Sequence, residues 1–296
     1  MANLPEGTTN KNVKKEILVS VWNFCPVSSS ERTHYVYMNH PAKMRPSLAK
    51  AILQLYGESP VLDPMAGIGT TLVESMLLGM DSVGIKFEGK FVDQANKNIE
   101  HVKGINASNR LGQAVCIQGD ARDLSHLSDD FNKENAGGKK DSGLFGSVIF
   151  SPPFGEANRG SGIAKNGYEG EHGKDEELKD RCDRPLSQDK NNVSNLVYSR
   201  TYFAEMFRVY NECYRVLRSS KFMVIVIRDI RRRGLTIPLG AETIKLCQRA
   251  GFKVFDIIIN KTYPPSFWQL NRAKKDQERG INHPLRNHEY VLVFKK

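Results

Sequence analysis

Hydrophobic residues along this chain fall into short continuous runs and into longer runs with helical spacing. The short runs predict buried strands and cover residues 16–22, 60–64, 82–87, 114–120, 146–154, 221–230, 253–260 and 289–296. The longer runs have apolar residues every three or four positions, which predicts amphipathic helices over residues 45–57, 71–80, 89–103, 201–217 and 241–251. This alternation predicts an α/β fold with a mainly parallel sheet, helices on both faces and an antiparallel last strand.

Polar stretches divide the remainder of the chain. Residues 1–15 are expected to be a disordered tail, and residues 127–143 a loop. Residues 155–200 are long, charged and poor in apolar side chains, so we expect an inserted loop region that is either functional or disordered. The other residues from 16 to 296 are predicted to form a single domain.

Composition narrows the class of protein. Lys and Arg outnumber Asp and Glu by 43 to 33, which favours a polyanionic partner, although a soluble protein can be basic without one. The five cysteines are far apart, so neither a zinc site nor a disulfide framework is indicated. No apolar run is long enough to span a bilayer, and the N-terminus lacks the apolar core of a secretory signal. A cytoplasmic location without metal or membrane is therefore expected.

The sequence VLDPMAGIGTT, residues 61–71, predicts a tight turn between a buried strand and a helix. Gly67 and Gly69 would allow a ligand to approach the backbone closely. Asp63 stands at the strand end, where its carboxylate can bind a cationic ligand or only cap the turn. The turn lacks the spacing of both the dinucleotide fingerprint and the phosphate loop, so on its own it indicates a nucleotide site in general terms.

Two further strand ends carry polar residues. The strand in SVGIKFEG ends at Lys86, where nucleotide-binding folds often have an acid that holds a ribose, and Glu88 follows two places later. Asp120 follows the next strand. Because ligands of doubly wound sheets bind at the carboxyl ends of the strands, these residues predict a crevice there.

The segment VIFSPPFG gives the most specific signal. A strand leads directly into Ser151, Pro152, Pro153 and Phe154. The prolines have a fixed φ and no N–H, so the segment is predicted to be rigid, with Phe154 held where a flat ligand can stack on it. The alternative is a proline turn followed by a core phenylalanine.

The motifs DPMAGIGTT and SPPF, preceded by HPAKMRPSLAKAIL and followed by HEYVLVFKK, resemble the DNA amino-methyltransferases in their gamma-like motif order. That resemblance implies a Rossmann-like methyltransferase fold with a mainly parallel seven-stranded sheet, and S-adenosylmethionine as cofactor. In this family a serine at the first tetrad position is more often found with cytosine-N4 chemistry. The resemblance therefore implies a site-specific DNA cytosine-N4 methyltransferase, of the kind found in restriction–modification; a partner nuclease is possible.

The resemblance also implies roles for individual residues. Ser151, Pro152, Pro153 and Phe154 would be catalytic and would hold the target base. The cofactor would be bordered by His40, Pro41, Lys43, Asp63, Pro64, Ala66, Gly67, Gly69, Thr70, Thr71, Lys86, Phe87, Glu88, Asp120 and Ala121.

Mixed basic and aromatic segments suit contact with phosphates and bases, although they can equally be solvated loops with a few core aromatics. RDIRRRG carries four arginines, and residues 260–288 interleave Tyr263, Phe267 and Trp268 with basic side chains. They provide the candidate DNA contacts Arg231, Arg232, Arg233, Trp268, Arg272, Lys274 and Lys275.

Three alternatives stay open. The enzyme can act on adenine N6 in DNA, or on an amine in RNA. The chain can also be a nucleic-acid-binding protein that has lost catalysis, an option that Lys86 keeps open. Oligomeric state is not indicated by the sequence.

Overall fold

The computed structural model describes residues 19–24, 32–37, 44–106, 110–125, 127, 144–153, 200–232, 235–262, 270, 273–274, 277–278, 280, 282 and 287–296. The predicted tail 1–15 and the predicted insert, except Arg200, lie outside these residues. No helix among the described residues is both long enough and apolar enough to cross a membrane.

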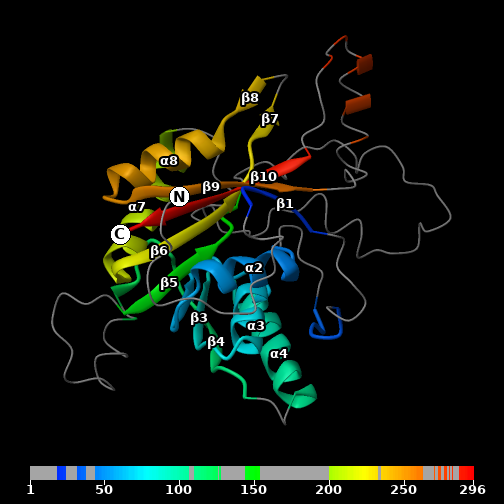
Figure 1. The fold of residues 1–296 in the computed structure, drawn as a ribbon, viewed down its shortest axis with the longest axis vertical. Helices are drawn as coiled ribbons and strands as arrows, with labels where there is room; N and C mark the ends of the chain where they lie inside the picture. The colour runs from blue at the N-terminus through cyan, green and yellow to red at the C-terminus, as the bar shows by residue number, and fades with distance from the viewer. Residues whose placement is uncertain are drawn as a thin grey trace.

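One eight-stranded sheet forms the centre of the molecule (Figure 1). Its strand order is β1-β9-β10-β6-β5-β2-β3-β4, and β10 is antiparallel to both of its neighbours. The strands are β1 (Val21–Asn23), β2 (Val61–Asp63), β3 (Ser82–Lys86), β4 (Ala114–Gln118), β5 (Phe145–Phe150), β6 (Leu217–Ile227), β9 (Lys253–Lys261) and β10 (His288–Lys295). The predicted α/β class and the antiparallel last strand are confirmed.

The predicted count of seven strands is wrong, because β1 adds an eighth. This short strand pairs in parallel with β9, with Val21 opposite Ile259. The side chain of Trp22 is only 1% exposed and packs in the same core cluster as Leu48 of the first helix. Burial of a tryptophan on one side of a three-residue strand is what holds β1 at the sheet edge.

Helices cover both faces of the sheet, as predicted (Figure 1). One face carries α2 (Pro46–Tyr56), α3 (Thr70–Leu77) and α4 (Gly89–Ile105), and the other carries α7 (Arg200–Val216) and α8 (Leu239–Arg249). Each helix buries one apolar stripe; α7, for example, places Met206, Val209 and Tyr210 in the core.

A two-stranded hairpin, β7 (Ile230–Arg232) and β8 (Leu235–Ile237), stands apart from the main sheet. The sequence predicted only a basic loop here. The hairpin forms because Ile230 and Ile237 pair in the ladder and both pack against the main core.

Candidate active site

The two strongest motifs meet where the strand order of the sheet reverses. From β2 the sequence proceeds through β3 and β4 in one direction, whereas β5 and β6 lie on the other side of β2. The glycine turn follows β2 and the Ser-Pro-Pro segment follows β5, so both lie at the carboxyl edge of adjacent strands. This switch point is where open α/β sheets bind ligands.

The glycine turn has the geometry that a ligand cradle needs. Gly67 and Gly69 have φ values of 56° and 84°, in the left-handed region that favours glycine. A Cβ on Gly69 would lie 3.1 Å from the Cβ of Ala95. Gly69 also precedes α3 directly, so the free N–H groups at the start of that helix border the turn.

Asp63 is a buried carboxylate at the end of β2, only 4% exposed. It accepts hydrogen bonds from the backbone N–H of Met65, at 3.0 Å, and from the side chain of Thr71. Burial raises the pKa of Asp63 to about 6, and the two hydrogen bonds and the charge of Lys86 only partly oppose that rise. The carboxylate is therefore ionised at neutral pH at a cost in folding free energy, a pattern associated with functional sites.

Lys86 and Glu88 form an ion pair at the end of β3. The Nζ of Lys86 lies 2.6 Å from Oε2 of Glu88, and both side chains are largely buried, with 14% and 13% exposure. The same ammonium lies 5.2 Å from the ring centroid of Phe91. Lys86 therefore does not replace the expected acid; it neutralises Glu88 and stabilises the charge on Asp63.

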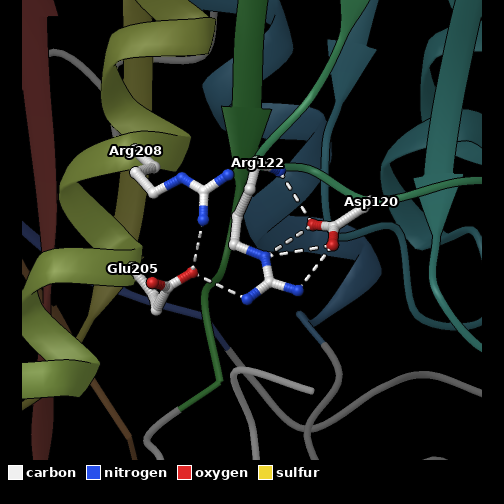
Figure 2. Close-up of polar contacts among 4 residues, drawn as sticks. All are labelled: Asp120, Arg122, Glu205 and Arg208. Carbon is white, nitrogen blue, oxygen red and sulfur yellow. Dashed lines mark hydrogen bonds and ion pairs between the residues drawn. The ribbon is translucent and has the colours of Figure 1, made fainter. Parts of the chain in front are cut away.

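Asp120 is held by Arg122 at the end of β4 (Figure 2). The guanidinium contacts both carboxylate oxygens, with Nε at 2.9 and 3.0 Å and a terminal nitrogen at 2.6 Å. The pKa of Asp120 is lowered, because hydrogen bonds from Arg122 outweigh the opposing effect of burial. Arg122 also contacts Glu205 of α7 at 2.7 Å, and Glu205 in turn contacts Arg208, so Asp120 is tied to that helix.

The hydroxyl proton of Ser151 is used in a hydrogen bond to a neighbouring strand. Its hydroxyl donates to the carbonyl of Val226 on β6 at 2.9 Å, at the point where Pro152 and Pro153 have no N–H to offer the neighbouring strand. The lone pairs of Oγ therefore remain as acceptors. Sequence reasoning could not find this contact, because Val226 lies 75 residues away.

Tyr202 of α7 is a site residue that the sequence did not reveal. Its hydroxyl donates to the carbonyl of Pro153 at 2.8 Å, and the side chain is 2% exposed. The contact holds the Ser-Pro-Pro segment against α7. In the sequence, the helical spacing of apolar residues in α7 indicated that Tyr202 is buried. No sequence signal indicated its hydrogen bond to the carbonyl of Pro153.

A small cleft joins the two motifs. It is lined by Met44, Asp63, Met65, Ala66, Gly67, Ile68, Thr70, Thr71 and Ser151. The predicted cofactor turn and the first residue of the predicted catalytic segment therefore face the same space. Met44, Met65 and Ile68 are additional lining residues that the motifs did not include.

Several predicted residues do not line this cleft. Pro64 and Ala121 are buried beside the strand ends, and Phe87 is partly buried between Lys86 and Glu88. Other predicted residues lie outside the described part of the chain, namely His40, Pro41, Lys43, Phe154, Arg233, Trp268, Arg272 and Lys275. Arg231 and Arg232 belong to β7, and Lys274 is exposed.

The residues present fit S-adenosylmethionine. A buried carboxylate, Asp63, suits a cationic ligand, and Glu88 and Asp120 place two further acids at the ends of the next two strands. The left-handed glycines leave space for close backbone approach.

Comparison with known proteins agrees with this geometry. Residues 33–165 match the family described as RMKL-like, methyltransferase domain. A type II beta methyltransferase, M.BslI of Bacillus sp. (strain NEB-606), is 34% identical over 107 residues, which is 32% of this chain and 11% of that protein. The tRNA (guanine(10)-N2)-dimethyltransferase of Methanothermobacter thermautotrophicus is 32% identical over 96 residues, 31% of this chain and 26% of that protein.

The chain thus spans only 11% and 26% of these two curated relatives. Among solved structures, a SAM-dependent methyltransferase from Methanosarcina mazei aligns with 80% of this chain and 91% of its own, at 12% identity and a TM-score of 0.45. Residues 33–165, less than half of the chain, thus match a methyltransferase domain, and the glycine turn and the acidic strand ends within them fit S-adenosylmethionine as the cofactor.

Proposed function

We propose that this protein transfers a methyl group from S-adenosylmethionine to an exocyclic amine of a nucleic-acid base, with cytosine N4 in DNA as the leading target. The observation that carries the proposal is the shared cleft: Ser151 lies in it together with Asp63 and the glycine turn. The net charge of +10 favours a polyanionic substrate, and the partial likeness to M.BslI supports DNA.

The polar atoms of Ser151 and Pro152 suit an amine as the acceptor of the methyl group. The lone pair of an exocyclic amine is delocalised into the ring, so the nitrogen is a poor nucleophile. Ser151 Oγ, whose proton is directed at Val226, can accept a hydrogen bond from the amine, and the Pro152 carbonyl is the second proposed acceptor. Two acceptors would draw the amine protons out of the ring plane and stabilise the positive charge that grows on nitrogen.

The cofactor, when bound, supplies a methyl group on a positively charged sulfur. Asp63 is proposed to attract that cation, while Glu88 and Asp120 are proposed to hold the ribose and the adenine. The rate would then come mainly from holding the two reactants in line. The methylated nitrogen would finally release its additional proton to water.

A second candidate target is an amine in tRNA. The likeness to the tRNA guanine-N2 dimethyltransferase favours this target. That match extends over 96 residues, which is 31% of this chain. The basic composition fits either nucleic acid.

Product identification separates these targets. The protein would be incubated with methyl-labelled S-adenosylmethionine and unmodified DNA or tRNA, and the nucleic acid digested to nucleosides. We expect label in N4-methylcytosine from DNA. Label in N6-methyladenine or in a tRNA nucleoside would reject the cytosine assignment. Absence of label together with absence of cofactor binding by calorimetry would favour a protein that only binds nucleic acid.

Tyr202 is expected to position the proline carbonyls during transfer. Tyr202→Phe removes the hydrogen bond to Pro153, and we expect single-turnover methyl transfer to fall about tenfold, because small displacements of positioning groups are costly to rate. Affinity for S-adenosylmethionine should stay within about twofold of the original, since the hydroxyl of Tyr202 bonds to Pro153, in the segment proposed to hold the base.

Tyr210→Phe provides a matched control for this experiment. Tyr210 lies on the same helix, is 1% exposed and bonds to Thr243 rather than to the Ser-Pro-Pro segment. Both variants lose one buried hydroxyl, so both should lose similar stability, and only Tyr202→Phe should lose rate. Equal rate losses in the two variants would assign Tyr202 a purely structural role.

A further inference from the structure

The segment that follows β4 is held against α7 at two points. A terminal nitrogen of Arg122 donates to the carboxylate of Glu205 at 2.7 Å, and the backbone N–H of Leu124 donates to the carboxylate of Glu212 at 2.8 Å. Each glutamate also pairs with an arginine three residues later on the helix. Because residues 205 and 212 are seven positions apart, the two glutamates lie on the same side of α7, about two turns from each other.

The carboxylate of Asp120 depends on Arg122 for its orientation. Within the described part of the chain, every hydrogen bond that this carboxylate accepts comes from the backbone N–H or the guanidinium of Arg122. The last torsion of an aspartate side chain is soft, whereas the planar fork of a guanidinium favours one orientation of the carboxylate. The side chain of Asp120 is still 34% exposed, so part of it stays accessible to a ligand.

Glu205 holds Arg122 in turn, because it contacts the guanidinium at the nitrogen that Asp120 does not use (Figure 2). Three residues earlier on the same helix, Tyr202 donates to the carbonyl of Pro153 at 2.8 Å. Side chains three positions apart on a helix are neighbours, and groups carried by helices are placed more precisely than groups on loops. One turn of α7 therefore contacts the Ser-Pro-Pro segment directly and Asp120 through Arg122.

Stability alone is a weak explanation for this arrangement. The side chains of Arg122 and Glu205 are only 14% and 19% exposed, and a buried ion pair gains little over well-packed apolar residues, because desolvation offsets the attraction. Apolar burial already attaches the segment, since Ala121, Leu124 and Leu127 share a core cluster with the apolar stripe of α7. The ion pair adds a fixed orientation, which apolar contacts do not supply.

We propose that Arg122 and Glu205 are positioning residues, which fix Asp120 relative to the Ser-Pro-Pro segment through α7. The inference rests on the proposed function, in which Asp120 holds the adenine of the cofactor and the Ser-Pro-Pro segment holds the target base. Loss of the pair should weaken recognition of the adenine amino group, because the carboxylate that accepts from it is no longer held in one orientation. Loss of the pair should also slow transfer in the loaded enzyme.

Glu205→Gln removes the charge that holds Arg122 with almost no change of shape. Glu212→Gln is the matched control, because it removes the same charge from the same side of α7 and from a contact to the same segment, but not from Arg122. Calorimetry would compare the binding of S-adenosylhomocysteine with that of S-inosylhomocysteine, in which an oxygen replaces the amino group of adenine. This measurement requires neither nucleic acid nor methyl transfer.

We expect the original protein and Glu212→Gln to prefer the adenosyl compound by about tenfold or more, as for a hydrogen bond to a charged acceptor. In Glu205→Gln this preference should fall to about threefold or less. Arg122→Lys keeps the charge but loses the fork, so it should show the same loss and serves as the second variant if Glu205→Gln does not fold. Thermal unfolding measures the folded fraction of each protein.

Three results would overturn the positioning role. They are an unchanged preference in Glu205→Gln and Arg122→Lys, equal losses in Glu205→Gln and Glu212→Gln, and the absence of any preference in the original protein.

A double-mutant cycle tests the connection through α7. With cofactor saturating, Glu205→Gln should slow single-turnover transfer about fivefold. Combined with Tyr202→Phe, it should cost less than the product of the two single losses, because once either contact to α7 is lost the other no longer fixes the spacing. Losses that multiply fully would reject the connection.

Failure of this inference and failure of the proposed function are distinguishable. A protein whose adenine preference depends on Glu205, but which methylates no nucleic acid, would reject the proposed function and keep the positioning of Asp120. A protein that methylates DNA or tRNA, with Glu205→Gln and Glu212→Gln alike in rate and in adenine preference, would do the reverse.

Discussion

Ser151→Ala is expected to lower the rate of methyl transfer by about 100-fold, the cost typical of removing one preorganised polar group from a transition state. The substitution removes the proposed Oγ acceptor from a residue that lines the cleft, while the glycine turn proposed to hold the cofactor stays in place. The affinity for S-adenosylmethionine should therefore stay within about threefold of the original. Single-turnover rates with labelled cofactor, alongside calorimetric binding, measure the two quantities separately.

Ser147→Ala is the matched control for this experiment. Ser147 is a buried serine of β5, the strand that leads into Ser151, and its hydroxyl donates to the carbonyl of Glu58 at 3.0 Å, away from the cleft-lining residues. Both variants leave a partly buried carbonyl without a side-chain donor, so both should unfold more easily. Only Ser151→Ala should lose rate per folded molecule. Equal rate losses, or a loss of cofactor affinity that parallels the loss of rate, would contradict the role given to Ser151.

Asp63→Asn is expected to stabilise the fold at neutral pH and to weaken cofactor binding by about tenfold or more. The pKa of Asp63 rises from 3.8 to about 6 on folding. A raised carboxyl pKa favours the folded state at low pH, and that contribution is lost as the pH rises through about 6. At pH 7.5 the ionised side chain therefore costs the fold about 3 kcal/mol, at 1.36 kcal/mol per pKa unit.

Asparagine removes that cost because it carries no charge, although it also changes the hydrogen bonds to Met65 and Thr71. The stability advantage of Asp63→Asn over the original protein should grow by about 1–2 kcal/mol between pH 5 and pH 7.5, measured by denaturant unfolding at each pH. Cofactor affinity of the original protein should fall as the pH drops below about 6, because the proposed attraction to the cationic cofactor disappears when Asp63 is protonated.

Asp81→Asn is the control that separates the effect of burial from the effect of replacing any aspartate by asparagine. Asp81 is exposed and accepts a hydrogen bond from the N–H of Gln113 at 2.8 Å, so it resembles Asp63 in bonding but not in burial. Its replacement should leave both the pH dependence of stability and the cofactor affinity nearly unchanged. If Asp63→Asn is instead less stable than the original at pH 7.5, the carboxylate contributes to folding and the proposed trade-off is wrong.

The local parts of the site could be predicted because each depends on a short stretch of chain. Hydrophobic runs separated by helical spacing located the helices and the strands of the main sheet. The glycine turn was visible because left-handed backbone between a strand and a helix requires glycine. Ser151 was visible because two prolines end a strand abruptly.

The unusual lysine at the end of β3 shows the limit of such reasoning. The sequence identified Lys86 as an exception to the expected acid and Glu88 as its possible replacement. Only the structure shows that the two form an ion pair and that the lysine also stabilises the charge on Asp63. Side-chain direction at a turn depends on backbone angles that residue spacing does not specify.

The sequence by itself determined the α/β class, the order of the helices and of the strands of the main sheet, the glycine turn and the Ser-Pro-Pro segment. The tertiary structure alone decided that β1 completes an eight-stranded sheet, that Val226 takes the proton of Ser151, and that Tyr202 and Arg122 tie α7 to the two ends of the site. These contacts join residues 49 to 83 positions apart. Strand and turn preferences act over a few neighbouring residues, whereas such pairs meet only after the sheet has brought distant strand ends together.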